Sequence, residues 1–332
     1  MPTLTSFDQQ DRLVLFGSGL VENASTYSFT GATVTDTAAD NNTIDVYYAS
    51  GEQNRSAYLN RTALPTHGFG PVSVTTAGGT SAALALPVVQ VAVEGTSLGD
   101  VAIDSASGAM WVSDYTSPGH LLRIDPASGA VLQTITLSND FGTPYLYNLA
   151  GLQVVPAAFT LGATAVPAGS LLVFNGYANP DRVIAVNTST GAVIASLVLA
   201  ANHDLTAGLY DPTSGHLFIA TNAGSSLREI DATTGAQIGA DIAVPINVQS
   251  WSGLAIDPVS GNLWIGSTTS RVTSSVADIA RVVEITRAGI EVRRIALASQ
   301  GLDEAEISGL AFAPDGKLWV SSTQGVLYRM QT

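Results

Sequence analysis

The chain has 332 residues, of which 46% are hydrophobic and 12% charged, with a formal net charge of −14 and no cysteine. This composition indicates a folded protein with a large core rather than a disordered one, and it excludes disulfides and thiolate metal sites. The acidic charge, with Lys317 as the single lysine, argues against nucleic acid and anionic membranes as partners, because both attract basic surfaces.

The location of the protein is indicated by composition alone. No apolar run reaches the roughly 18 residues that a membrane span needs, and no charged-then-apolar leader opens the chain. A lysine-poor, acidic chain rich in Thr, Ser, Ala and Gly is typical of secreted bacterial surface proteins, so we expect an extracellular or cell-surface location. We then expect the chain to be part of a longer one or to leave the cell without a cleaved leader.

Residues 1–84 show short alternating strands between frequent turn signals, a pattern that favours a β-sandwich. The predicted strands are Leu13–Phe16, Thr26–Phe29, Thr43–Tyr48 and Pro71–Thr76.

This first segment resembles IPT/TIG immunoglobulin-like domains. Leu15-Phe-Gly-Ser-Gly-Leu20 is similar to their early strand and glycine turn, and Gly70-Pro-Val-Ser-Val-Thr-Thr-Ala-Gly-Gly-Thr-Ser81 to their closing strand. Between them, Ala49–Pro65 departs from the pattern as a polar insertion. The resemblance implies a spacer or contact module without catalytic residues.

The rest of the chain repeats one pattern of an apolar run, a turn and a second apolar run, and a period of roughly 40–50 residues is typical of solenoids, propellers or arrays. In Asp257-Pro-Val-Ser-Gly261 the aspartate can bond the backbone ahead, proline presets φ, and glycine supplies a positive φ, so each copy is a predicted hairpin. The copies are Gly99–Ser113, a split copy at Ala150–Val155 and Ser170–Phe174, Thr206–Ala220, Ser252–Gly266 and Ser308–Ser321.

A second hairpin follows each of the first four copies, at Leu122–Leu132, Ile184–Ile194, Arg228–Ile238 and Val283–Val292. Two hairpins make a four-stranded antiparallel sheet, which is one propeller blade. The last unit stops after its third strand at Gly325–Arg329, and the run Leu86–Glu94 can supply the missing one. We therefore predict an all-β chain, with an immunoglobulin-like β-sandwich at 1–84 and, at 85–332, a five-bladed β-propeller that an N-terminal strand closes without an open edge.

The Gly-Leu-Ala-x-Asp and Gly-x-Leu-Trp-Val repeats resemble those of NHL-like, streptogramin-lyase-like and SMP-30/gluconolactonase-like propellers. The SMP-30-like resemblance implies a metal-binding Asp just before the inner-strand glycine, where this chain has Ser252, Ser308 and Gly99. The streptogramin-lyase-like resemblance implies histidines near the channel mouth, and His203 is the one at a suitable place.

The repeat itself explains two further sets of residues. An aromatic at a fixed strand position (Trp111, Phe218, Trp264 and Trp319) is interpreted as core packing between blades rather than a sugar platform. The aspartates at the turns (Asp104, Asp125, Asp211, Asp231 and Asp257) are interpreted as turn caps rather than calcium ligands, because sustained calcium-loop spacing is absent.

Two departures from the repeat are candidate binding loops, because such departures map to loops on one face. One is the aromatic loop with Phe141, Tyr145 and Tyr147, and the other is the insertion Val155–Gly169. The alternative is that these loops only cover the sandwich domain or each other.

A polar residue precedes the start of each inner strand, and these residues are expected to ring the channel mouth: Ser97, Asn148, Asp204, Ser250 and Glu306. Oxygen ligands with limited negative charge suit Ca²⁺ rather than zinc. We therefore predict a weak calcium site at Asp204 and Glu306, with His203 nearby as a candidate base. The alternative is that these side chains cap the strand starts and are solvated by channel water.

The favoured function is non-catalytic binding or adhesion on a bacterial surface, with carbohydrate or another surface protein as partner, because serine stands where the metal-binding aspartate is implied. A metal-dependent hydrolase or lyase at the channel mouth and a purely structural spacer are the alternatives. The sequence does not indicate an oligomeric state.

Overall fold

The computed structural model describes residues 1–9, 12–29, 32–37, 44–46, 54–60, 71–84, 89–93, 97–114, 119–126, 129–137, 149–176, 180–222, 224–248, 252–267, 281–296, 307–323 and 325–330. Regular structure in these ranges consists of β-strands, so the all-β prediction is confirmed. Within the same ranges, the chain forms no helix of the length and apolarity that crossing a membrane requires.

The N-terminal part forms two four-stranded antiparallel sheets around one core. One sheet has the order β1 (Thr3–Gln9), β2 (Arg12–Ser18), β6 (Ser56–Asn60), β5 (Ile44–Val46), and the other β4 (Ala32–Thr35), β3 (Thr26–Phe29), β7 (Ser73–Thr76), β8 (Gly79–Thr80). Leu15 and Leu59 of the first sheet and Tyr27 and Val74 of the second are fully buried in this core. Two packed sheets are the expected sandwich.

The interpretation of Ala49–Pro65 as a polar insertion is wrong for Ser56–Asn60, which form a strand of the sandwich. Strand β6 lies there, between β2 and β5 in the first sheet. Ala57 and Leu59 alternate with polar neighbours and are fully buried. Alternation over so few residues is a weak sequence signal, although it is the pattern of a half-buried strand.

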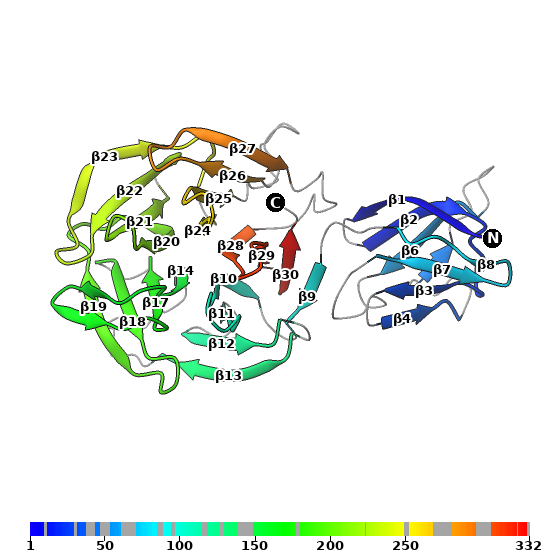
Figure 1. Cartoon of the computed structure of the whole chain (residues 1–332), viewed down its shortest axis with the longest axis horizontal. Helices are drawn as coiled ribbons and strands as arrows, with labels where there is room; N and C mark the ends of the chain where they lie inside the picture. Colours follow the sequence, from blue (N-terminus) through cyan, green and yellow to red (C-terminus); the bar gives the residue numbers. More distant parts are fainter. Residues whose placement is uncertain are drawn as a thin grey trace.

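After the N-terminal part, the described strands form five four-stranded antiparallel sheets and one two-stranded hairpin. Figure 1 shows the five sheets around a common centre. Their strands, from the innermost outward, are β10 (Leu98–Ile103), β11 (Met110–Asp114), β12 (His120–Ile124) and β13 (Val131–Thr136); β14 (Leu149–Val154), β17 (Leu171–Asn175), β18 (Arg182–Val186) and β19 (Val193–Val198); β20 (Leu205–Asp211), β21 (His216–Thr221), β22 (Ser226–Asp231) and β23 (Gln237–Ala243); β24 (Ser252–Ile256), β25 (Leu263–Ser267), β26 (Arg281–Ile285) and β27 (Glu291–Ala296); and β28 (Ile307–Phe312), β29 (Leu318–Ser322), β30 (Val326–Met330) and β9 (Val89–Ala92).

The last sheet is completed by a strand from far earlier in the chain, as the sequence predicts. β9 pairs with β30, Val91 opposite Leu327 and Val89 opposite Arg329, and Val93 N–H adds a bond of 2.9 Å to the Gly325 carbonyl. Val88 lies outside the described residues. The pairing of Val89 and Val91 is confirmed, and it joins the first sheet to the last.

Neighbouring inner strands pack against one another in the cyclic order β10, β14, β20, β24, β28 and back to β10. The repeated aromatics fill the space between the sheets, with exposed fractions of 5% or less for Trp111, Phe218, Trp264 and Trp319. Their interpretation as core residues is confirmed.

Several turns of the ring use their own aspartate side chain, as the sequence indicates. In the fourth sheet, Asp257 Oδ1 accepts a 2.8 Å bond from Val259 N–H and Oδ2 a 2.9 Å bond from the Ser260 hydroxyl, and Gly261 has φ 72°. Asp104, Asp211 and Asp231 accept equivalent bonds in their turns. These carboxylates fold the hairpins, which explains them without a metal.

The insertion Val155–Gly169 packs between the second and third sheets. Its hairpin, β15 (Phe159–Leu161) with β16 (Thr164–Val166), buries Leu161 and Val166 in the core of those sheets. Phe159 stacks on Tyr210 with ring centroids 3.9 Å apart. This part of the insertion therefore packs on two sheets of the ring, a place that neither the binding-loop prediction nor its alternative named.

Candidate functional site

A cavity of about 360 Å³ opens on the axis of the ring, at the end where the inner strands finish and their first turns begin. All five inner strands and all five turns contribute to it. Its lining residues are Val101, Ala102, Ile103, Ser105, Leu152, Gln153, Val154, Pro156, Leu209, Pro212, Leu254, Ala255, Ile256, Pro258, Leu310, Ala311, Phe312, Ala313 and Pro314. The cavity lies at the opposite end of the inner strands from the predicted calcium ring.

The repeat explains why this cavity is apolar. The inner strands end in mostly apolar residues, such as Leu254-Ala-Ile256, and residues of all five strand ends line the cavity at the axis. Four turns then place a proline at the mouth, at positions 156, 212, 258 and 314. Because proline has a fixed φ and no N–H, these mouth residues are rigid and lack a main-chain donor.

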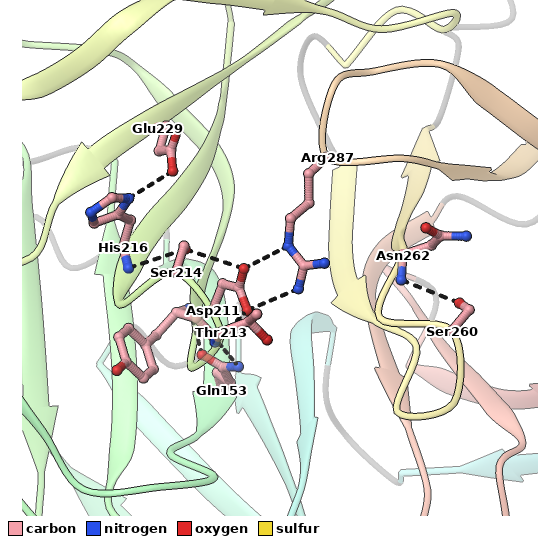
Figure 2. Close-up of polar contacts among 10 residues, drawn as sticks. Gln153, Asp211, Thr213, Ser214, His216, Glu229, Ser260, Asn262 and Arg287 are labelled. Carbon is pink, nitrogen blue, oxygen red and sulfur yellow. Dashed lines mark hydrogen bonds and ion pairs between the residues drawn. The ribbon is translucent and has the colours of Figure 1, made fainter.

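The cavity lining contains no ionisable side chain. Its one amide, Gln153, is held by the third sheet: Oε1 accepts a 2.6 Å bond from Tyr210 N–H, and Nε2 donates a 3.0 Å bond to the Tyr210 carbonyl. Figure 2 shows Gln153 beside the Asp211 turn. The lining thus offers apolar contact in a preorganised shape and no group for acid–base chemistry.

The floor below this lining is made by residues that let the inner strands approach closely. The strand register gives equivalent positions to Asp100, Gly151, Ala207, Gly253 and Gly309. A Cβ added to Gly253 would lie 2.5 Å from the Gly309 carbonyl carbon, and one on Gly151 would lie 2.6 Å from the Gly208 nitrogen. The glycine of the repeat is therefore required by contact between neighbouring inner strands.

Asp100 is the one long side chain at this level, and it is 1% exposed. Its carboxylate accepts bonds of 2.8 Å from Val101 N–H and 2.7 Å from Leu152 N–H, and Leu310 N–H contributes from the other neighbouring strand. Burial raises the pKa of Asp100 well above its usual range, while these backbone bonds oppose the rise. One carboxylate thus ties together the inner strands of the first, second and last sheets.

An ion pair lies beside the cavity mouth and joins the third and fourth sheets. Arg287 donates from Nε and Nη2 to the two oxygens of Asp211, at 2.7 and 3.0 Å, as Figure 2 shows. Asp211 is fully buried and precedes Pro212 of the lining. Burial alone would raise its pKa, but the bonds from Arg287, Thr213 and Ser214 outweigh burial and lower it. This bidentate pair fixes the position of one mouth turn.

His203 lies in a second polar cluster, with Asp181, Arg228 and Asp241. Arg228 donates to His203 Nδ1 at 2.8 Å and pairs with Asp241 at 3.1 Å. His203 is therefore the neutral tautomer with its proton on Nε2, which is buried without a partner among the described residues. Burial, and then the charge of Arg228, lower the pKa of His203.

Asp181 holds the backbone of the His203 loop. Its carboxylate accepts the His203 N–H, and Asn202 faces it with an amide that can donate to both oxygens. Burial raises the pKa of Asp181 to about 6, although the bond from His203 N–H lowers it in part. The cluster is thus a buried support for the loop that leads to Asp204.

The predicted calcium ring stays a prediction, because most of its residues, Asn148, Ser250 and Glu306, lie outside the described residues. The Ser97 hydroxyl donates to the Thr323 carbonyl, and Asp204 is exposed with φ 48°. Among the described residues, no three His, Asp or Glu side chains cluster as metal ligands would. The predicted aromatic site at Phe141, Tyr145 and Tyr147 also lies outside the described residues.

Sequence reasoning did not find Asp100, Asp181 or Arg287. For Asp100 a signal existed, since it breaks the run of small residues at one repeat position. Arg287 lies in the shorter turn of the fourth sheet, which is a second departure from the repeat. Asp181 precedes an ordinary strand, and no local pattern marks it as the anchor of a loop that follows about twenty residues later.

No protein-family model matches the chain, and no curated protein matches it. Among solved structures, it is similar to virginiamycin B lyase from Staphylococcus aureus, at 14% identity and TM-score 0.40 over 98% of this chain and 100% of that one. A putative phosphatase from Bacteroides thetaiotaomicron aligns at 10% identity and TM-score 0.42, over 99% and 96%. A protein of unknown function from Bacteroides caccae aligns at 14% and 0.39, over 76% and 79%. At these TM-scores, no property of the similar structures is transferred to this chain.

Proposed function

We propose that the chain is a non-catalytic binding module, in which a five-bladed β-propeller takes an uncharged apolar group of its partner into the axial cavity. The observation that carries this proposal is the lining, which combines aliphatic side chains from every inner strand with prolines from four of the five turns and contains no ionisable group. Ligand pockets typically have volumes of roughly 300–1,000 Å³ and mostly apolar linings. The cavity of about 360 Å³ therefore suits a small ligand or one large apolar group of a bigger partner.

The lining also favours binding over catalysis. A hydrolase or lyase acting here needs an acid, a base, a nucleophile or a metal ligand within reach of its substrate. Carboxylates that adjoin the lining in the chain are already engaged: Asp100 and Asp211 by backbone donors or by Arg287, and Asp104 and Asp257 by the N–H groups of their own turns. In this proposal all four are structural groups.

The proposal includes the setting of the module. The N-terminal pair of sheets is proposed as an immunoglobulin-like spacer or contact domain, because it is a small sandwich with its own core. The acidic, cysteine-free composition supports an extracellular or surface location and a role in adhesion.

Fluorescence titration with N-phenyl-1-naphthylamine, an uncharged apolar probe, tests the proposed function. We expect saturable enhancement with the wild-type protein and at least a tenfold loss of affinity for Ile256→Glu, because a charge in the lining must be desolvated by the probe. The matched control is Val292→Glu on the outer strand β27, where Val292 is 51% exposed. No saturable binding, or equal binding by Ile256→Glu, would refute the proposal.

Calcium at the opposite end of the axis remains a separate part of the proposal. Asp204 is exposed there and available to solvent cations, and calorimetry of chelator-treated protein against Ca²⁺ tests it. Heat that disappears in the Asp204→Ala/Glu306→Ala double variant supports the site, and absence of heat at millimolar calcium removes it.

A further inference from the structure

A second, polar cleft of about 210 Å³ lies between the first and second sheets. It differs in chemistry from the axial cavity, since most of its lining side chains are polar. The lining residues are Asp104, Ser107, Ala109, Trp111, Arg123, Gln133, Val154, Gly169, Thr188 and Ser189. No part of the proposed apolar site uses Arg123, Gln133 or Thr188.

Arg123 is the cation of this cleft, and the strand register puts it in a row with Trp111 and Gln133. In the fourth sheet the same row is Trp264, Glu284 and Arg293. There the charge is satisfied within the protein, because Glu284 accepts a 2.6 Å bond from Arg293 and a 2.8 Å bond from Asn262.

The third sheet repeats the comparison. Its equivalent residue, Glu229, pairs with His216 at 2.7 Å. For Arg123, by contrast, no described residue serves as a hydrogen-bond or ion-pair partner, and the guanidinium lines an open cleft instead. The first sheet thus leaves unfilled a position that the third and fourth sheets fill with their own side chains.

Two other groups of the cleft are held in place. Gln133 Nε2 donates a 2.9 Å bond to the Thr188 carbonyl of the second sheet, which leaves its Oε1 as an acceptor without a donor among the described residues. Asp104 is fixed by its turn, where Ala106 N–H donates at 3.0 Å and the Ser107 hydroxyl donates to the other oxygen. The lining therefore combines the guanidinium donors of Arg123 with the acceptor oxygens of Asp104 and of its cross-strand neighbour Gln133.

This donor set selects a class of ligand. One positive and one negative side chain leave the cleft close to neutral, while the protein as a whole carries a net charge of −14 that repels anions. A ligand that fills the cleft has to accept from Arg123 and donate to Asp104 and Gln133 at once. Adjacent hydroxyl groups do both, since each is a donor and an acceptor.

From this geometry we infer that the cleft is a binding site for one neutral sugar ring, through adjacent hydroxyls that bridge Arg123 and Asp104. The inference is independent of the apolar site, because the two sites share only Val154 of their linings. Trp111 is only 3% exposed, so it cannot stack on a sugar ring, and we expect the site to bind weakly.

Saturation-transfer difference NMR with methyl glycosides of glucose, galactose, mannose, xylose and N-acetylglucosamine tests this inference on the whole chain. We expect transfer to at least one of them, with affinity falling about tenfold in Arg123→Met, because a bond to a charged donor is lost. The matched control is Arg329→Met, at the same register position beside Trp319 in the last sheet, which should keep the transfer.

Gln133→Leu gives a second, milder variant that keeps the charge, and it should weaken the same glycoside by several-fold. Circular dichroism and the urea midpoint establish that each variant is folded. The assignment of a neutral sugar would be overturned by no transfer to any glycoside, or by unchanged transfer in folded Arg123→Met. It would also be overturned if glycine or sulfate, added at a lower concentration than the glycoside, displaced the glycoside. Probe binding in the axial cavity is unaffected by any of these outcomes.

Discussion

Replacing Gly253 by alanine should destabilise the ring of sheets, because the new Cβ would overlap the backbone of a neighbouring inner strand. The new Cβ would lie 2.5 Å from the Gly309 carbonyl carbon and 2.6 Å from the Leu310 nitrogen. Both atoms belong to the backbone of β28, so the overlap cannot be relieved by a side-chain rotation. The inner strands β24 and β28 have to move apart by about 1 Å to restore ordinary contact, which also strains the neighbouring pairs of strands.

The expected cost is about 3 kcal/mol, at the upper end of what overpacked core substitutions cost. With a urea m-value of about 3 kcal/mol/M, the midpoint falls by roughly 1 M. Gly151→Ala meets the Gly208 backbone on another pair of strands, and the two effects should add within about 0.5 kcal/mol.

Urea unfolding followed by far-UV circular dichroism and tryptophan fluorescence measures these costs. Gly78→Ala is the control, because its Cβ would meet ordinary contacts at 3.5 Å or more, and we expect a change within about 0.5 kcal/mol. If Gly253→Ala unfolds at the wild-type midpoint with an unchanged m-value, the inner strands do not approach as described and the account of the repeat glycine is wrong.

Three further changes have defined outcomes. The pKa of Asp181, raised from 3.8 to about 6 by burial, means that the folded state binds its proton more tightly than the unfolded chain. Lowering the pH from 7 to 4 should therefore stabilise the wild type relative to Asp181→Asn by up to about 3 kcal/mol, measured by urea unfolding at each pH. His203, whose pKa is lowered by folding, destabilises both proteins as the pH falls, so its effect cancels in the comparison. A parallel pH profile of the two proteins would contradict it. Arg287→Met should cost about 3 kcal/mol by the same assay at pH 7, because it leaves the buried Asp211 unpaired, whereas Arg294→Met, from a half-exposed pair, should cost less than about 1 kcal/mol. Deleting residues 86–94 removes the strand that pairs with β30, so the thermal midpoint of the ring should fall sharply, and an unchanged midpoint would rule out closure by this strand.

The repeat made the ring predictable, because its turns carry a local mechanism. Asp, Pro and Gly at fixed offsets in Asp257-Pro-Val-Ser-Gly261 specify a hairpin without any tertiary information. The count of hairpins left the last unit one strand short. The run Leu86–Glu94, which contains β9, was the stretch available to complete it. The repeated tryptophans followed from the same periodicity.

The N-terminal sandwich and the sites were harder to predict, for different physical reasons. Strands such as β6 are short, and their hydrophobic alternation spans only Ala57 and Leu59. The axial cavity is formed by the ends of five strands that are far apart in sequence, and the sequence of each strand end is that of an ordinary core strand. Arg123 is recognisable as unusual only when the register of three sheets shows that Glu229 and Glu284, at the same position, have partners.

A crystal structure of the protein soaked with N-phenyl-1-naphthylamine tests the proposed binding function most directly. The account predicts the probe on the ring axis, in contact with Ile103, Leu254 and Phe312 and bordered by the four mouth prolines. A probe bound elsewhere, with the axial cavity filled by ordered water, would contradict it.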